Sequence, residues 1–89
     1  MEIGSIHNYY ESLVSEYMFE DALKGEQVDQ DFIEDVACLA LNRLPARYVR
    51  HAVDMAFFLT TPERERMQQR VIEAVREAIQ QVRNGQRDS

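Results

Sequence analysis

The first quarter of the chain has the hydrophobic period of an amphipathic helix. Its apolar residues fall at positions 6, 9, 10, 13, 14, 17, 18 and 22, and this i, i+3, i+4, i+7 spacing places them on one face of a helix. Ser5 stands before the pattern as an N-cap residue, and Gly25 follows it as a stop signal. The sequence therefore predicts a first helix over residues 5–23.

A second helical pattern follows the polar loop GEQVDQD. Asp31, with Glu34 three residues later, matches a capping box, and Asp29 is the other candidate N-cap. Pro45 disfavours helical geometry in the residue before it, so this helix is expected to end near Arg43. The inward-facing positions are expected to be Phe32, Ile33, Val36, Ala37, Ala40, Leu41 and Leu44.

A third helix is predicted from residue 62 to about residue 84. Thr61 is a candidate N-cap, Pro62 suits the first helical position, and Glu63 complements the positive first turn. Apolar residues recur at alternating spacings of four and three and form a seam for packing against another helix, within the chain or in a second subunit. The seam consists of Met67, Val71, Val75, Ala78 and Val82 and is widened by Ile72 and Ile79.

Residues 53–59, VDMAFFL, fit two structures. Their alternating pattern favours a short strand, while two helical turns also accommodate it. A single strand needs a partner, and the same strand of a second copy across a two-fold axis would supply one. The predicted fold is therefore a mainly α, three-helix small domain of residues 1–89, with its core at about 6–84 and a short strand at 53–59. Since so small a core makes a marginal monomer, a homodimer is expected.

Charge is distributed unevenly along the chain. Residues 1–42 hold ten acidic residues against Lys24, and residues 43–89 hold nine arginines against six acidic residues, so the net charges are −9 and +3. The overall charge of −6 argues against direct DNA binding, because affinity for a polyanion rests on neutralising many phosphates. A small anionic ligand needs only a few arginines.

Other features of the sequence favour a cytoplasmic protein. The start MEIGSIHNYY has neither the basic nor the apolar region of a signal peptide, and no apolar run approaches the roughly 20 residues that span a bilayer. Cys38 is the only cysteine, so an internal disulfide cannot form, and its place in an apolar helical pattern predicts a buried, inert thiol. No spacing typical of a catalytic, phosphate-loop or metal site occurs, so no enzyme activity is expected.

The densest positive charge follows Pro45, in the segment RYVRH. One interpretation is that the arginines pair with the carboxylates of the first half, within the chain or across a dimer interface. The other is an anion site, in which guanidinium groups bind phosphate oxygens and Tyr48, Tyr9 or Tyr10 offers a face to a base. The site residues on this second interpretation are Arg43, Arg47, Tyr48, Arg50 and His51.

Residues 35–49, DVACLALNRLPARYV, resemble the signature of the late competence development protein ComFB family, D-[VI]-x-A-L-A-L-N-x-L-P-P-x-Y-V. Upstream, Asn8, Glu11 and Val14 are similar to the family's N-x-x-E-x-[LV]-V pattern, and residues 71–82 resemble its closing helix. Many members carry a zinc-associated cysteine cluster before the second helix, but GEQVDQDFIED has none. Cys38 stands where the signature has alanine, so no metal or other cofactor is expected.

The resemblance implies a small, mostly helical, dimeric bacterial protein. Some relatives, notably in cyanobacteria, are cyclic dinucleotide receptors that influence competence and motility. The leading hypothesis is therefore a non-enzymatic signalling homodimer that binds cyclic di-GMP or cyclic di-AMP near Pro45, where a two-fold ligand suits a two-fold protein. The alternative is a ligand-free dimeric interaction module, whose acidic first half binds an unidentified protein partner and whose arginines serve the dimer interface.

Overall fold

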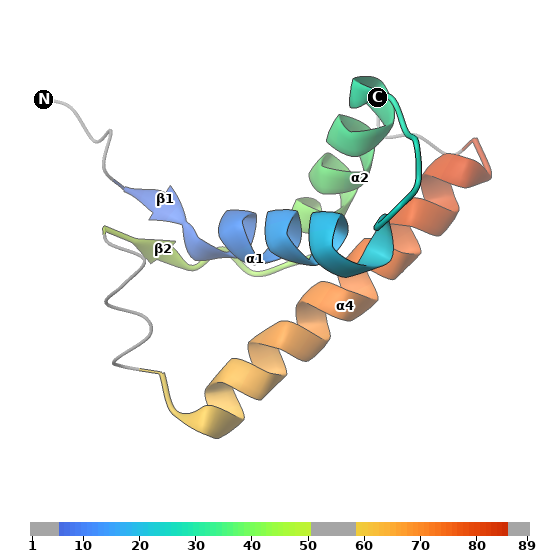
Figure 1. Ribbon diagram of the computed structural model, residues 1–89. Helices are drawn as coiled ribbons and strands as arrows, with labels where there is room; N and C mark the ends of the chain where they lie inside the picture. The colour runs from blue at the N-terminus through green and yellow to red at the C-terminus, as the bar shows by residue number, and fades with distance from the viewer. Residues whose placement is uncertain (1–5, 51–58, 86–89) are drawn as a thin grey trace, which may run out of the picture.

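The computed structural model describes residues 6–50 and 59–85, and helices dominate them (Figure 1). The elements are β1 (His7–Asn8), α1 (Tyr9–Tyr17), the π-helical turn η1 (Met18–Ala22), α2 (Gln30–Asn42), β2 (Tyr48–Val49) and α4 (Thr61–Arg83). Figure 1 shows α4 as the longest helix, with α1 and α2 packed against it and the two strands side by side near the start of α1. The predicted mainly α fold with three helices is confirmed.

The core lies between α1, α2 and α4. Val36 of α2 and Val71 and Val75 of α4 have no exposed surface, and burying a valine side chain stabilises a fold by about 1.5–2 kcal/mol. The predicted seam on α4 is confirmed, because its five members are buried while Ile72 and Ile79 at its edge are only half-buried. The remaining fully buried side chains, with under 2% of their surface exposed, include Val14 and Met18.

The first helix begins later than predicted. Asn8 is its N-cap, and the Asn8 side-chain oxygen accepts a hydrogen bond from the backbone N–H of Tyr10 at 3.2 Å. The apolar residue at position 6 lies before the helix and is exposed, so the pattern that suggested a start at residue 5 extended beyond the helix itself. At its other end, α1 widens into η1, and Gly25 follows with a φ of 78°, a conformation that favours glycine.

The predicted boundaries of α2 and α4 are correct to within one or two residues. Asp29 rather than Asp31 caps α2, since its side chain accepts from the N–H of Phe32 at 2.8 Å. Thr60 rather than Thr61 caps α4, with its hydroxyl accepting from the N–H of Glu63 at 3.3 Å. In both cases two suitable residues stand close together, and the side chain that reaches the N3 amide decides which one is the cap.

The two strands pair in an antiparallel manner, with His7 opposite Val49 and Asn8 opposite Tyr48. Hydrophobic period gives no sign of this pair, because each strand has only two residues. The strand predicted at 53–59 lies almost wholly outside the described residues; Leu59, which the structure does describe, is buried and belongs to neither a strand nor a helix.

Candidate functional site

The backbone of Arg47 is held by the residues that begin α1. Its N–H donates to the side-chain oxygen of Asn8 at 2.9 Å, and its carbonyl accepts from the N–H of Tyr9 at 2.7 Å. Asn8 therefore serves twice, as the N-cap of α1 and as the anchor of the segment after Pro45. These bonds fix the point from which the Arg47 side chain leaves the main chain.

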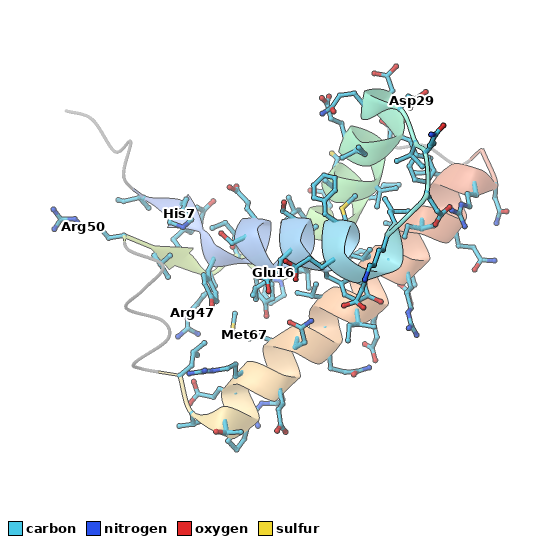
Figure 2. All side chains as sticks on the ribbon, viewed as in Figure 1. His7, Glu16, Asp29, Arg47, Arg50 and Met67 are labelled. Carbon is cyan, nitrogen blue, oxygen red and sulfur yellow. The ribbon has the colours of Figure 1, made fainter. Side chains whose placement is uncertain are left out.

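The Arg47 side chain lines a cleft at the start of α4. Figure 2 shows it pointing from the strand pair toward that end of the helix, where Met67 lies. The cleft has a volume of about 280 Å³. It is lined by Arg47, Leu59, Glu63, Arg66, Met67 and Arg70.

Positive charge dominates this cleft, with three guanidinium groups against the single carboxylate of Glu63. Arg66 and Arg70 are four residues apart on α4, so they lie on one flank of the helix about 6 Å apart along its axis. Within the described part of the chain, no ion pair involves Arg47, Arg66 or Arg70. Buried Leu59 and Met67 supply apolar surface beneath them. We call this cleft, which is lined by Arg47, Arg66 and Arg70, the arginine cleft.

Arg43 has a different environment from Arg47. Its guanidinium forms an ion pair with Glu77 at 2.6 Å and also donates to the side-chain oxygen of Gln81. The prediction that arginines pair with carboxylates thus holds for Arg43, but its partner is in the second half of the chain rather than the first. The pair borders a second cleft of about 240 Å³. That cleft is lined by Arg43, Leu44, Pro45, Arg70, Glu73, Ala74 and Glu77, so Arg70 belongs to both.

The other predicted site residues lie apart from the arginine cleft. Tyr48 is on β2 with 69% of its surface exposed. Arg50 is also exposed, and Figure 2 shows its side chain extending away from the helices while that of Arg47 points toward α4. His51 lies outside the described residues. The structure therefore places Arg47 in one cleft with Arg66 and Arg70, which were not among the predicted site residues. The sequence did contain a signal for them, because they are an i, i+4 pair of arginines beside the apolar seam.

Cys38 is exposed, which corrects the prediction of a buried thiol. It lies on α2 beyond the edge of the buried stripe, and its sulfur accepts a weak hydrogen bond from the side chain of Asn42 at 3.9 Å. The prediction of a buried thiol was wrong because the residues next to Cys38 in the sequence are apolar, although the Cys38 side chain itself points away from the core. Across residues 6–50 and 59–85, no three His, Cys, Asp or Glu side chains are grouped as a metal site requires.

Comparison with known proteins supports one assignment. The family model described as "Late competence development protein ComFB" matches residues 7–86, which is nearly the whole chain. No curated protein and no solved structure matches the chain. None of the helices in the described part of the chain has the length and apolar character needed to cross a membrane.

Proposed function

Because the chain belongs to the late competence development protein ComFB family, we propose that it is a non-enzymatic regulatory protein that binds a cyclic dinucleotide, such as cyclic di-GMP or cyclic di-AMP, at the arginine cleft. The family model itself supports the coarser statement, a competence-related bacterial protein. The ligand, and the residues that hold it, are our inference from the geometry of the site.

The observation that carries the proposal is the meeting of Arg47, Arg66 and Arg70 in one cleft. Three guanidinium groups beside one carboxylate repel one another unless an anion lies between them. Phosphate is the anion that guanidinium groups bind best, because their paired N–H donors match two of its oxygens. The cleft would therefore accept one phosphate of the ligand.

The adjoining cleft offers a place for the second phosphate. Arg70 lines both clefts, and Arg43 stands at the far side of the second one. Arg43 would first have to leave Glu77, which is a small cost because both side chains of this ion pair are exposed, by 38% and 62%. One chain can thus supply arginines for two phosphates, so the ligand need not be shared between two subunits.

Tyr48 lines neither cleft, and we propose it as the aromatic group that stacks on a base extending beyond them. It follows Arg47 directly in the chain, and 69% of its surface is exposed. Tyr10 is buried and Tyr9 half-buried, so neither offers an open face. Stacking of a base on an aromatic side chain contributes about 1–3 kcal/mol, so Tyr48 would add affinity without selecting between guanine and adenine.

Isothermal titration calorimetry with cyclic di-GMP and cyclic di-AMP tests this proposal. Loss of the charge-assisted bonds of one arginine costs about 1.5–3 kcal/mol, so Arg70→Ala should weaken binding about 10- to 100-fold. Lys24→Ala is the control, because it removes one positive charge from an exposed turn that lines neither cleft. Equal affinities of the Arg70→Ala and wild-type proteins would exclude the arginine cleft as the site.

The alternative is a ligand-free interaction module in which the arginines hold two subunits together. It predicts that neither nucleotide gives heat at ligand concentrations of about 100 μM. It also predicts that Arg47→Ala combined with Arg50→Ala dissociates a dimer. The cyclic dinucleotide proposal requires the reverse result, a loss of ligand affinity with the oligomeric state unchanged.

A further inference from the structure

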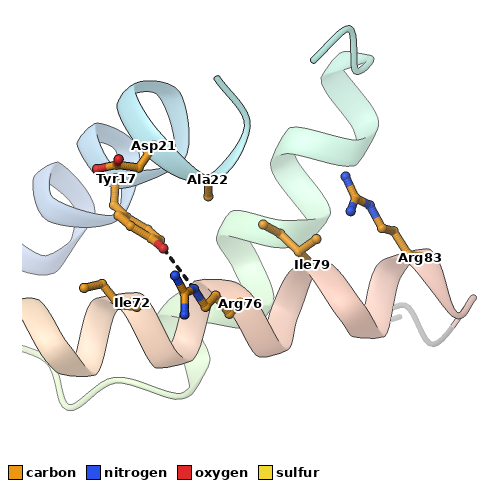
Figure 3. Close-up of a pocket in the computed structure, with 7 residues that line it drawn as sticks. All are labelled: Tyr17, Asp21, Ala22, Ile72, Arg76, Ile79 and Arg83. Carbon is orange, nitrogen blue, oxygen red and sulfur yellow. Dashed lines mark hydrogen bonds between the residues drawn. The ribbon is translucent and has the colours of Figure 1, made fainter. Parts of the chain in front are cut away.

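A further cleft, with a volume of about 560 Å³, lies between α4 and η1 (Figure 3). Arg76, which lines it, is six residues beyond Arg70, so the two arginines lie about 120° apart around the helix axis. The cleft is therefore on a different flank of α4 from the arginine cleft. It is lined by Tyr17, Asp21, Ala22, Ile72, Arg76, Ile79 and Arg83.

This cleft continues along α4 into a neighbouring one of about 290 Å³. The two clefts share Arg76, Ile79 and Arg83. From Ile72 to Arg83 the surface extends over eleven residues, which is about 16 Å of helix, or three turns. The second cleft is lined by Arg76, Ile79, Gln80, Arg83 and Asn84. We call the two clefts together the α4 groove.

Apolar and basic side chains alternate along the α4 groove. Ile72 and Ile79 are seven residues apart, and so are Arg76 and Arg83, so each pair repeats with the period at which two helices pack side by side. Ile72 and Ile79 are only half-buried. The groove therefore presents apolar surface, at helical spacing, that the rest of the described chain leaves partly uncovered.

The Arg76 side chain is held in position for a group outside the fold. Its Nε donates to the hydroxyl of Tyr17 at 3.2 Å, and Tyr17 is itself buried with 7% of its surface exposed (Figure 3). Within residues 6–50 and 59–85, no carboxylate forms an ion pair with Arg76. A side chain that is already ordered loses little conformational entropy on binding, and arginine is one of the residues that contribute most to protein interfaces.

The charge of the groove selects the kind of partner. Arg76 and Arg83 line it against the single carboxylate of Asp21. Arg83 forms an ion pair with Glu26 at 2.6 Å, but 50% and 44% of these two side chains are exposed, so another carboxylate can replace Glu26 at little cost. An acidic partner therefore complements the groove.

We infer that the α4 groove binds an amphipathic helix of another protein, whose contacting face repeats one apolar and one acidic residue every seven positions. The apolar residues of this helix cover Ile72 and Ile79, and its carboxylates pair with the guanidinium groups of Arg76 and Arg83. A helix laid in a groove matches this repeat, whereas an extended peptide presents every second side chain to the same face. The nucleotide cleft and the partner groove then lie on two flanks of one rigid helix.

Fluorescence anisotropy with two fluorescein-labelled synthetic peptides tests the inference. The first peptide has three heptads of alanine and glutamine, with leucine at the first and glutamate at the fifth position of each heptad. The second peptide has glutamine in place of each glutamate. The glutamate peptide should bind the wild-type protein, and the glutamine peptide should bind about tenfold more weakly, because it forms no charge-assisted hydrogen bonds.

Protein variants identify the groove as the binding site. Arg76→Gln should weaken binding of the glutamate peptide about fivefold and change that of the glutamine peptide less than about twofold, because the two charges act as a pair. Ile79→Ala should weaken both peptides alike, since it removes apolar contact area. Lys24→Gln removes a positive charge outside the groove and should bind as the wild type does. Circular dichroism verifies that each variant is folded.

Several results would overturn the inference. They are no binding of the glutamate peptide at protein concentrations up to about 1 mM, equal affinities of the two peptides, and an equal effect of Arg76→Gln on both. Peptide binding that falls as the protein concentration rises would assign the groove to a second copy of the chain, which also contradicts the inference. Because no nucleotide is present, none of these results affects the calorimetric test of the arginine cleft.

Discussion

Asn8 joins two parts of the fold, so its replacement by alanine should affect both. The Asn8 side-chain oxygen accepts from the N–H of Tyr10, in the first turn of α1, and from the N–H of Arg47, which leads into β2. Alanine removes this acceptor while preserving backbone geometry. Aspartate keeps the acceptor and is an equally good N-cap, so Asn8→Asp is the matched control.

The expected loss follows from the two bonds. Removing a capping side chain costs about 1 kcal/mol. Losing the bond to the Arg47 amide costs about 1 kcal/mol more, a moderate value because this residue is exposed and water can replace the acceptor. Asn8→Ala should therefore lower the free energy of unfolding by about 2 kcal/mol, which for a chain of this size lowers the melting temperature by roughly 10 °C.

Urea unfolding followed by circular dichroism measures the effect, at one protein concentration because dimerisation would shift the midpoint. Asn8→Asp should stay within about 0.5 kcal/mol of the wild type. The double role of Asn8 is refuted if Asn8→Ala is as stable as the wild type, or if Asn8→Asp loses as much as Asn8→Ala does. Weaker nucleotide binding by Asn8→Ala, relative to Asn8→Asp, would further indicate that this anchor positions Arg47.

Three other substitutions test separate features by the same urea titration. Gly25→Ala should cost about 1 kcal/mol, because the φ of 78° disfavours any side chain while the space around it is open; no loss would contradict the assigned turn. Val75→Ala removes a completely buried side chain and should cost about 2–3 kcal/mol, so a loss under about 1 kcal/mol would place Val75 outside the core. Glu77→Gln breaks an exposed ion pair with Arg43 and should cost under about 1 kcal/mol; a larger loss would show that the pair is a structural element.

The helices could be predicted from the sequence because each buries one stripe at helical spacing. The seam of α4 is the clearest case, since period, N-cap and Pro62 all agree. The caps of all three helices were less certain, because the choice between neighbours such as Thr60 and Thr61 depends on which side chain reaches the right amide. The pairing of His7 with Val49 was beyond prediction, since it joins two-residue segments about forty positions apart.

The candidate site was predictable only in part. Arg47 and Arg43 look alike in the sequence, yet Glu77 and Gln81 bind Arg43 and no described residue forms an ion pair with Arg47. This difference arises from the packing of α2 against α4, which brings residues more than thirty positions apart into contact. Tertiary packing also brings Arg47 into one cleft with Arg66 and Arg70. The spacing in the sequence shows only that Arg66 and Arg70 lie on the same side of α4.

Calorimetric titration with cyclic di-GMP and cyclic di-AMP, on the wild-type, Arg70→Ala and Lys24→Ala proteins, tests the central claim most directly. The arginine cleft predicts that one of the nucleotides binds the wild-type and Lys24→Ala proteins with equal affinity, at one ligand per subunit, and binds Arg70→Ala about 10- to 100-fold more weakly. Absence of heat with both nucleotides, or equal binding to all three proteins, would contradict it.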